Sequence, residues 1–440
     1  MKRRPSFTLA LSFLALIVVG AAALACPFAR NAGGWGDPLT ALFTACSAVC
    51  VTGLSVVDIA AEFSRAGQVV LLALVELGCL GLMTCGTILT VFIGRRLSLD
   101  QDFSLMNAYG VAQIHGVKKL IYWVVGSTAA IQVVGAAILY HVTGSAYESV
   151  FYSAMSFCNA GFSIRPESLA SFAAEPVALT TMALETILGG IGFLVIYNLG
   201  SLRPLRGGGR MPRSRLSLHT MVVLRFTAYL LAAAFVAVLI LEWNGALASY
   251  GFWQKLWVGF YQSVTPRTCG FTVTDVESLR PLTRLVYKVL MFIGGAPGSA
   301  AAGMKVTTFA VLLYTLRALC RGERETTLSN HIISFNTVRE SIVIFMAMTA
   351  FSVLFVGLLM WTESGTGLTS ERLSFEALSA ITTTGLSIGD TTARLSDFGR
   401  VVIMFAMFFG RLGALTVVLM IGDRESKRHI RFPNGELAVG

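Results

Sequence analysis

The sequence predicts an all-α polytopic membrane protein: four tandem repeats of helix, pore helix, loop and helix around a pseudo-fourfold central pore, with eight transmembrane helices. Three observations support this. Of the 440 residues, 55% are hydrophobic and 13% charged, whereas soluble domains average about 25% charged residues. Eight apolar stretches approach or exceed the roughly 20 residues that cross a bilayer as a helix. A short glycine motif recurs four times, about 110 residues apart.

The apolar stretches give the order of the elements. They lie near residues 7–25, 66–94, 120–140, 177–200, 221–241, 285–315, 341–361 and 399–422. Four shorter segments, near 38–50, 147–158, 257–266 and 373–382, precede the motifs and are too short to span. We expect each to be a re-entrant half-helix, because loops at membrane depth must line a watery cavity or be buried in protein. The predicted repeats are 1–97, 98–205, 206–325 and 326–422, followed by a tail, 423–440.

The recurring motif places small or polar residues before a glycine that is followed by Leu or Phe. Backbone carbonyls around such a glycine can replace the water shell of a cation, and glycine tolerates a left-handed backbone. Hydroxyls of Thr52, Thr268, Thr383 and Thr384 could add oxygens. The predicted ion-coordinating residues are Cys50, Val51, Thr52, Gly53, Cys158, Asn159, Ala160, Gly161, Arg267, Thr268, Cys269, Gly270, Thr382, Thr383, Thr384 and Gly385.

An acidic residue follows each motif at a similar spacing. These residues are Asp58, Glu167, Asp275 and Asp390. At the outer mouth of a pore they would concentrate cations electrostatically. The alternative is that they are ordinary solvated loop acids.

The basic residues predict the orientation in the membrane. More than half of the 34 Lys and Arg lie at the N-terminus, in the links 95–119, 203–215 and 317–339, and in 424–431. Because cytoplasmic segments carry an excess of Lys and Arg, both termini and all three links are expected on the cytoplasmic side of the membrane. This placement explains the net charge of +10 without a nucleic-acid partner. The links could bind anionic lipid or dock a partner.

The sixth apolar stretch contains a break that no other repeat is expected to share. Pro297 and the small residues around it should interrupt a helix in the membrane, whereas the other repeats carry only a pair of glycines three residues apart. We expect residues 294–303 to form a gate, although close helix packing through small residues is the alternative. The gate residues are Gly294, Gly295, Ala296, Pro297, Gly298, Ser299 and Gly303, together with Arg411.

Arg411 is unusual because it lies in the middle of the last apolar stretch. An arginine at the membrane centre costs about 2.5–3.5 kcal/mol on insertion scales, so it must face protein or water. We expect it in the pathway below the loops. The alternative, an ion pair with Glu76 or Glu185, is less favoured because both acids should lie in the outer halves of their helices. No role is assigned to these acids, and Lys305 is expected at a helix end near the cytoplasm.

The remaining residues argue against catalysis. None of the eight cysteines forms a CxxC pair, and the five histidines are scattered, so no metal or redox site is indicated. The metalloprotease motif HExxH does not occur. The glycines at 207–209 lack the preceding strand of a phosphate-binding motif. We therefore expect neither an enzyme nor a covalent cofactor.

The four motifs in register, the half-helices and the glycine pairs resemble the Trk/Ktr/HKT superfamily of potassium transporters over about residues 7–422. The length is most similar to the membrane subunit of Ktr-type uptake systems. The resemblance implies a selectivity filter for K+ at Gly53, Gly161, Gly270 and Gly385, with Na+ as a possible coupled or alternative ion. It also implies a gate at 294–303, control by Arg411, and a homodimer on a cytoplasmic ring of nucleotide-binding (RCK-type) subunits. ATP or ADP would act only through that ring.

Overall fold

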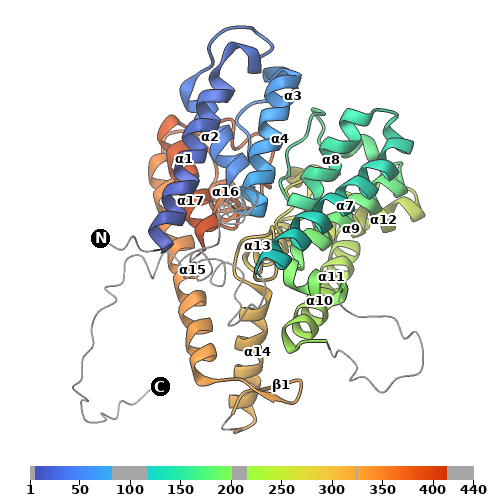
Figure 1. Cartoon of the computed structure of the whole chain (residues 1–440), viewed down its shortest axis with the longest axis vertical. Helices are drawn as coiled ribbons and strands as arrows, with labels where there is room; N and C mark the ends of the chain where they lie inside the picture. The colour runs from blue at the N-terminus through green and yellow to red at the C-terminus, as the bar shows by residue number, and fades with distance from the viewer. Residues whose placement is uncertain (1–4, 82–116, 201–215, 324, 414–440) are drawn as a thin grey trace, which may run out of the picture.

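The computed structural model describes residues 5–81, 117–200, 216–323 and 325–413 of the chain. Within these residues the protein is almost entirely helical (Figure 1). The one sheet described there is a hairpin of β1 (Thr327–Leu328) and β2 (His331–Ile332). The predicted helical fold class is confirmed.

The first repeat begins with α1 (Pro5–Ala25) and a short 3-10 turn, η1 (Pro27–Ala29). The half-helix α2 (Pro38–Val49) follows, then α3 (Ile59–Glu62) and α4 (Arg65–Leu80). Asp37 starts α2 because its carboxylate accepts a hydrogen bond from the Thr40 N–H, at 2.9 Å. Ser64 caps α4 in the same way.

The other repeats follow the same order. The second contains α7 (Val117–Thr143), the half-helix α8 (Ala146–Cys158), η2 (Ala170–Phe172), α9 (Pro176–Gly190) and α10 (Phe193–Gly200). The third contains α11 (Leu218–Glu242), α12 (Phe252–Val264), η3 (Val276–Ser278), α13 (Pro281–Phe292) and α14 (Val306–Cys320). The fourth contains α15 (Phe335–Thr362), α16 (Ser370–Ile381) and α17 (Asp397–Leu412). All four predicted half-helices are therefore present.

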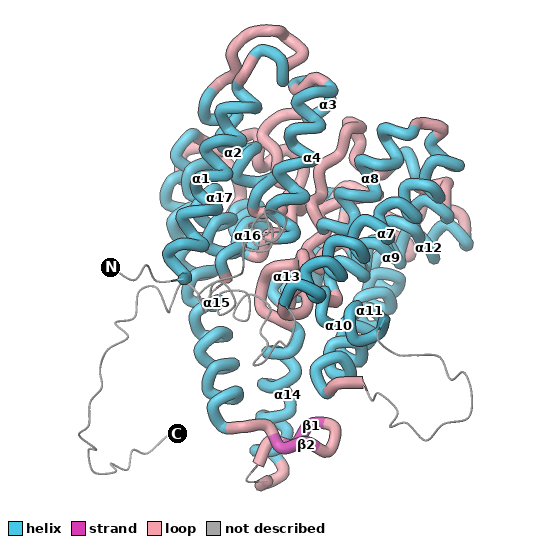
Figure 2. The backbone as a smooth tube through the Cα atoms, in the orientation of Figure 1, coloured by secondary structure: helices cyan, strands magenta, loops and turns pink. Residues whose placement is uncertain are grey.

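The helices pack in a closed cycle. In each repeat, the helix after the loop contacts the half-helix of the next repeat: α4 packs on α8, α9 on α12, α13 on α16, and α17 on α2. The last contact closes the cycle between residues far apart in the sequence. Figure 2 shows the loops gathered between the helices, while α14 and α15 extend below them to the β hairpin. The half-helices thus place the four motifs in the interior.

The number of continuous spans differs from the eight stretches expected. Within the described residues, three helices are long and apolar enough to cross a membrane: Tyr122–Thr143, Leu218–Glu242 and Phe335–Thr362. The predicted span 177–200 is instead two helices, α9 and α10, bent by 98° at the intervening residues. The arrangement of eight spans stays a prediction.

The expectation that only the third repeat is interrupted was wrong, and the second glycine of each pair explains why. Gly81, Gly192, Gly298 and Gly413 have φ angles of 78°, 90°, 65° and 82°. A positive φ ends an α-helix. Accordingly, α4 ends at Leu80 and α17 at Leu412, while α9 and α10 lie on either side of Gly192. In every repeat the helix therefore ends before the second glycine of the pair.

Candidate ion pathway

The four predicted loops begin where the half-helices end. Thr52, Thr268 and Thr384 are completely buried, and Ala160 is as well. The N–H of the residue before each glycine points back into its half-helix. Thr52 donates to the Ser47 carbonyl at 2.8 Å, Ala160 to Met155 at 2.9 Å and Thr384 to Ser379 at 2.8 Å. In the third loop, Cys269 donates to Thr265, the residue directly after α12, at 3.1 Å.

The backbone of the loops alternates in a way that repeats four times. The residue two before each glycine has a left-handed conformation: φ is 56° at Val51, 59° at Asn159, 69° at Thr268 and 47° at Thr383. The glycines themselves have φ angles of 91°, 50°, 81° and 86° at Gly53, Gly161, Gly270 and Gly385. The residue between them has a negative φ. Alternating signs of φ let successive carbonyls turn to the same side, which a ring of cation-coordinating carbonyls requires.

The loops also contact one another in a closed cycle. A Cβ placed on Gly53 would lie 2.6 Å from the carbonyl oxygen of Ala160, and one on Gly161 would lie 2.9 Å from that of Cys269. A Cβ on Gly270 would lie 2.6 Å from the oxygen of Thr384, and one on Gly385 would overlap that of Thr52. Each glycine therefore faces the carbonyl that precedes the next glycine. A side chain at any of the four positions would collide with this ring of oxygens.

Residues 293–304 form a closed loop where the helix of the third repeat is interrupted. The Met304 N–H donates to the Phe292 carbonyl at 3.1 Å and brings the two ends together. The loop is attached to the break between α9 and α10. Ala296 N–H donates to Gly190 at 2.9 Å, Ala300 N–H to Gly189 at 3.1 Å, and Phe193 N–H to Gly298 at 2.9 Å. We call residues 293–304 the intramembrane segment.

Arg411 joins this segment to the first repeat. Its guanidinium donates to the carbonyl of Ala300 at 2.6 Å and to that of Gly78, near the end of α4, at 2.5 Å. No ion pair of Arg411 occurs within the described residues, so its partners there are backbone carbonyls rather than Glu76 or Glu185. Lys305 directly follows the segment and donates to the Ala301 carbonyl within it, at 2.7 Å.

Comparison with known proteins identifies this arrangement. The TrkH family, described as cation transport proteins, matches residues 8–428. The chain belongs to the TrkH family.

Named relatives are similar in sequence to this TrkH-family chain over almost its whole length. It is 34% identical to Ktr system potassium uptake protein B of Bacillus subtilis, over 99% of this chain and 97% of that protein. It is 31% identical to Potassium/sodium uptake protein NtpJ of Enterococcus hirae, with the same coverage. The potassium transporter TrkH from Vibrio parahaemolyticus has a similar structure, with a TM-score of 0.76 and 16% identity over 96% of this chain and 85% of the other. The chain is thus a multi-pass membrane protein of a cation transporter family.

The four acids predicted for the outer mouth have different surroundings in this family member. Asp58 caps α3 through the Ala60 N–H, at 2.8 Å, and Asp275 caps η3 through the Glu277 N–H, at 3.0 Å. Asp390 lies 3.3 Å from Arg372 and 3.8 Å from Arg394. These three carboxylates have protein partners, which weakens the field each can offer a cation. No such partner is described for Glu167.

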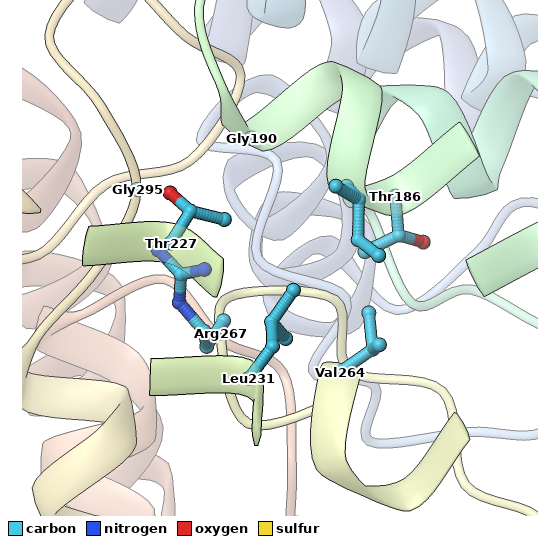
Figure 3. A pocket seen from close by; sticks show the side chains of 8 residues that line it. Thr186, Gly190, Thr227, Leu231, Val264, Arg267 and Gly295 are labelled. Carbon is cyan, nitrogen blue, oxygen red and sulfur yellow. The ribbon is translucent and has the colours of Figure 1, made fainter. Parts of the chain in front are cut away.

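The Arg267 side chain leaves the ring and enters a small cavity behind the third loop (Figure 3). Its guanidinium donates to the carbonyl of Gly294, on the intramembrane segment, at 3.2 Å. Thr186, Thr227 and Gly295 also line the cavity. Arg267 was predicted among the coordinating residues, and its guanidinium instead bonds to Gly294. Its side chain connects the third loop to the intramembrane segment.

Sequence reasoning missed the polar side chains that brace the loops from behind. Glu376 on α16 is completely buried and accepts hydrogen bonds from Ser387, at 2.7 Å, and from Thr392. In the second repeat Tyr152 makes the equivalent contact with Ser163, at 2.9 Å. Both stand nine residues before a motif glycine and bond to the hydroxyl two residues after it. A polar residue at that place in an apolar half-helix was the available signal.

Proposed function

We propose that this protein takes up potassium ions across the plasma membrane through the ring of four loops. The observation that carries the proposal is the cyclic contact of Gly53, Gly161, Gly270 and Gly385 with the carbonyls of the neighbouring loops. An alkali cation that enters the ring can exchange its water shell for these oxygens. The relatives named as potassium uptake proteins support K+ as the ion.

The intramembrane segment is proposed as the gate, and Arg411 is proposed to hold it closed. The segment is held by backbone hydrogen bonds to the α9–α10 break and by the guanidinium of Arg411. A loop held by a few bonds can move without unfolding the helices around it. Opening would then displace Ala300 from Arg411 and clear the path below the ring.

Regulation and orientation follow the family pattern in this proposal. The protein would form a homodimer in a bacterial inner membrane, with both termini in the cytoplasm, on a ring of nucleotide-binding subunits. The names of the Ktr system relatives support a system with more than one component. ATP or ADP would act on that partner and not on this chain.

Rescue of bacterial growth tests the proposal. A potassium-uptake-deficient bacterium on low K+ should grow when it expresses the intact chain with its regulatory partner. Gly53→Ser and Gly270→Ser should abolish or weaken rescue, because a side chain at either site meets a ring carbonyl. Failure of the intact protein to rescue contradicts potassium uptake, and full rescue by both variants contradicts the assignment of the filter.

A second candidate is the same fold carrying Na+, or K+ coupled to Na+ or H+. The relative named Potassium/sodium uptake protein favours this alternative. Flux measurements in which external K+, Na+ and pH are varied separately distinguish the candidates. Uptake of K+ that is unchanged by removal of Na+ and by a change of proton gradient excludes coupling.

A further inference from the structure

Glu185 lies behind the second loop, in a region that the proposed pathway does not use. It is in the middle of α9, and only 3% of it is exposed. One carboxyl oxygen, Oε1, contacts the hydroxyl of Ser153 on the half-helix α8. The other, Oε2, has no hydrogen-bond partner within the described residues. An acid inside a membrane protein is a candidate functional site by default.

Ser153 makes a second hydrogen bond, and the direction of this bond bears on whether Glu185 is protonated. The Ser153 hydroxyl lies 2.7 Å from the backbone carbonyl of Gln132 on α7. A serine hydroxyl has one hydrogen to donate, and a backbone carbonyl can only accept. If Ser153 donates to Gln132, its contact with Glu185 is a hydrogen bond only when Glu185 is the donor. Glu185 must then carry a proton on Oε1.

We propose that Glu185 is an intramembrane proton-binding site, with the Ser153 hydroxyl as the acceptor of its hydrogen bond. A second acid lies nearby, on the other side of Gln132. Ser153 bonds to the backbone carbonyl of Gln132, and the side-chain amide of the same residue donates to Glu76 on α4, at 2.6 Å. Gln132 therefore contacts both Glu76 of the first repeat and the Ser153 partner of Glu185 in the second.

The surroundings of Glu185 favour a proton over a metal ion. Gly135 on α7 closes the site, because a Cβ there would overlap Glu185 Oε1 and lie 2.9 Å from Ser153 Oγ. An alkali cation needs several oxygens around it, but the contact recorded for the Glu185 carboxyl in the described residues is Ser153 alone. A proton needs one acceptor, which the Ser153 hydroxyl supplies.

The titratable groups nearby do not neutralise a charged Glu185. Tyr261 faces it from α12, and α8 contributes the Cys158 thiol near Gln132. Glu148 at the outer end of α8 is paired with Arg165 instead. Within the described residues no Lys or Arg forms an ion pair with Glu185, and a buried carboxylate without a partner is costly.

Infrared difference spectroscopy on the purified full-length protein at neutral pH tests the site directly. The spectrum of the wild type minus that of Glu185→Gln should contain the carbonyl stretch of a protonated carboxylic acid, shifted in D2O. Glu148→Gln is the matched control. Glu148 belongs to the same repeat but forms an ion pair with Arg165, so its replacement should remove only carboxylate bands. Carboxylate bands alone in the Glu185 difference spectrum would overturn the proposal.

A second variant keeps the test decisive if Glu185→Gln does not fold. Ser153→Ala leaves the carboxyl in place but removes its acceptor, so the carboxylic-acid band should persist at a higher frequency. An unshifted band would show that Glu185 does not donate to Ser153 and would also overturn the proposal. Neither measurement requires transport, so their outcome is independent of the growth experiment.

Discussion

Three of the four residues that stand two positions before the motif glycines are β-branched: Val51, Thr268 and Thr383. All three have the left-handed backbone, which is rare for such residues and costs about 1–3 kcal/mol each. Strain of this kind persists only when the surrounding structure imposes it, and it gathers at functional sites. The left-handed backbone recurs at the same position in all four loops, and this supports the loops as the functional site of the protein.

Replacement of one ring glycine should separate backbone strain from blockage of the ring. Gly270→Ala places a Cβ 2.6 Å from the Thr384 carbonyl and should abolish most uptake. Gly33→Ala is the control, because Gly33 has a similar φ of 68° but no atom within 4 Å of its Cβ position. Both changes should destabilise the protein by about 1 kcal/mol or more. Radioactive rubidium uptake and thermal unfolding measure the two effects, and equal uptake by both variants would contradict the role of the ring.

Arg411 should control the intramembrane segment through its charge and its shape. Arg411→Ala removes the bonds to Ala300 and Gly78, so basal flux should rise or lose its regulation. Arg411→Lys should restore control only in part, because an ammonium group lacks the planar fork that can reach two carbonyls. Arg400→Ala on the same helix, where Arg400 pairs with Asp397, is the control. Unchanged flux after Arg411→Ala would indicate a purely structural arginine.

At the scale of elements, the intramembrane segment and the α9–α10 break form one unit. Three backbone hydrogen bonds join them, and Gly192 has a φ of 90° at the point of contact. A movement of either element must therefore break these hydrogen bonds or move the other element with it. The gate proposed for the third repeat is, on this view, built jointly by the second and third repeats.

Gly192→Ala tests this joint unit. Its Cβ would lie 2.8 Å from the Pro297 carbonyl, whereas a Cβ on Gly190 would meet only the Asn159 amide, at 3.6 Å. Gly192→Ala should disturb gating, while Gly190→Ala, two residues away, should have little effect. Single-channel or flux recordings with and without the regulatory partner measure the difference. Equal behaviour of the two variants would show that the contact does not matter.

At the scale of the whole molecule, the basic links predict which side of the membrane each end faces. Cys320 at the end of α14 is exposed, and Cys26 at the end of α1 is partly exposed, whereas Cys46, Cys50, Cys79, Cys158 and Cys269 are buried. The two thiols that are accessible within the described residues should lie on opposite faces, since α1 and α14 end at opposite ends of the molecule (Figure 1).

Thiol labelling with a membrane-impermeant reagent tests the orientation. In intact cells the reagent should modify Cys26 but not Cys320, and Cys320 should react after the membrane is made permeable. Cys26→Ser and Cys320→Ser, each made in a Cys85→Ser background because Cys85 lies outside the described residues, identify which thiol has reacted. Reaction of Cys320 in intact cells would place the basic links outside and reverse the predicted topology.

Much of this architecture was predictable because it repeats. The half-helices and the buried motif loops follow from apolar length and glycine spacing, which local sequence records directly. The Gly192 break was missed because a glycine pair in an apolar stretch also suits a continuous helix with close packing. Indeed, Gly78, Gly189 and Gly410 do pack against half-helix carbonyls. Only the backbone geometry separates the first glycine of each pair from the second.

The side-chain partners could not be read from the sequence for a different reason. Arg411 bonds to backbone carbonyls, which every residue carries, so no complementary residue type marks its partners. Glu185 and Ser153 are 32 residues apart, and their contact depends on the angle at which α8 and α9 cross. Arg267 looked like a coordinating residue because it lies in the motif, but its length carries the charge away from the ring.

The four loops belong to a single polypeptide, and this has a consequence for how ion preference can change. In an assembly of four identical subunits, one altered codon modifies every side of the opening at once. Here the positions that precede the glycines already differ, with Val51, Asn159, Thr268 and Thr383 at equivalent places. If the loops form the proposed filter, mutation can therefore adjust one quadrant of the coordination shell while the other three keep a bound ion in place.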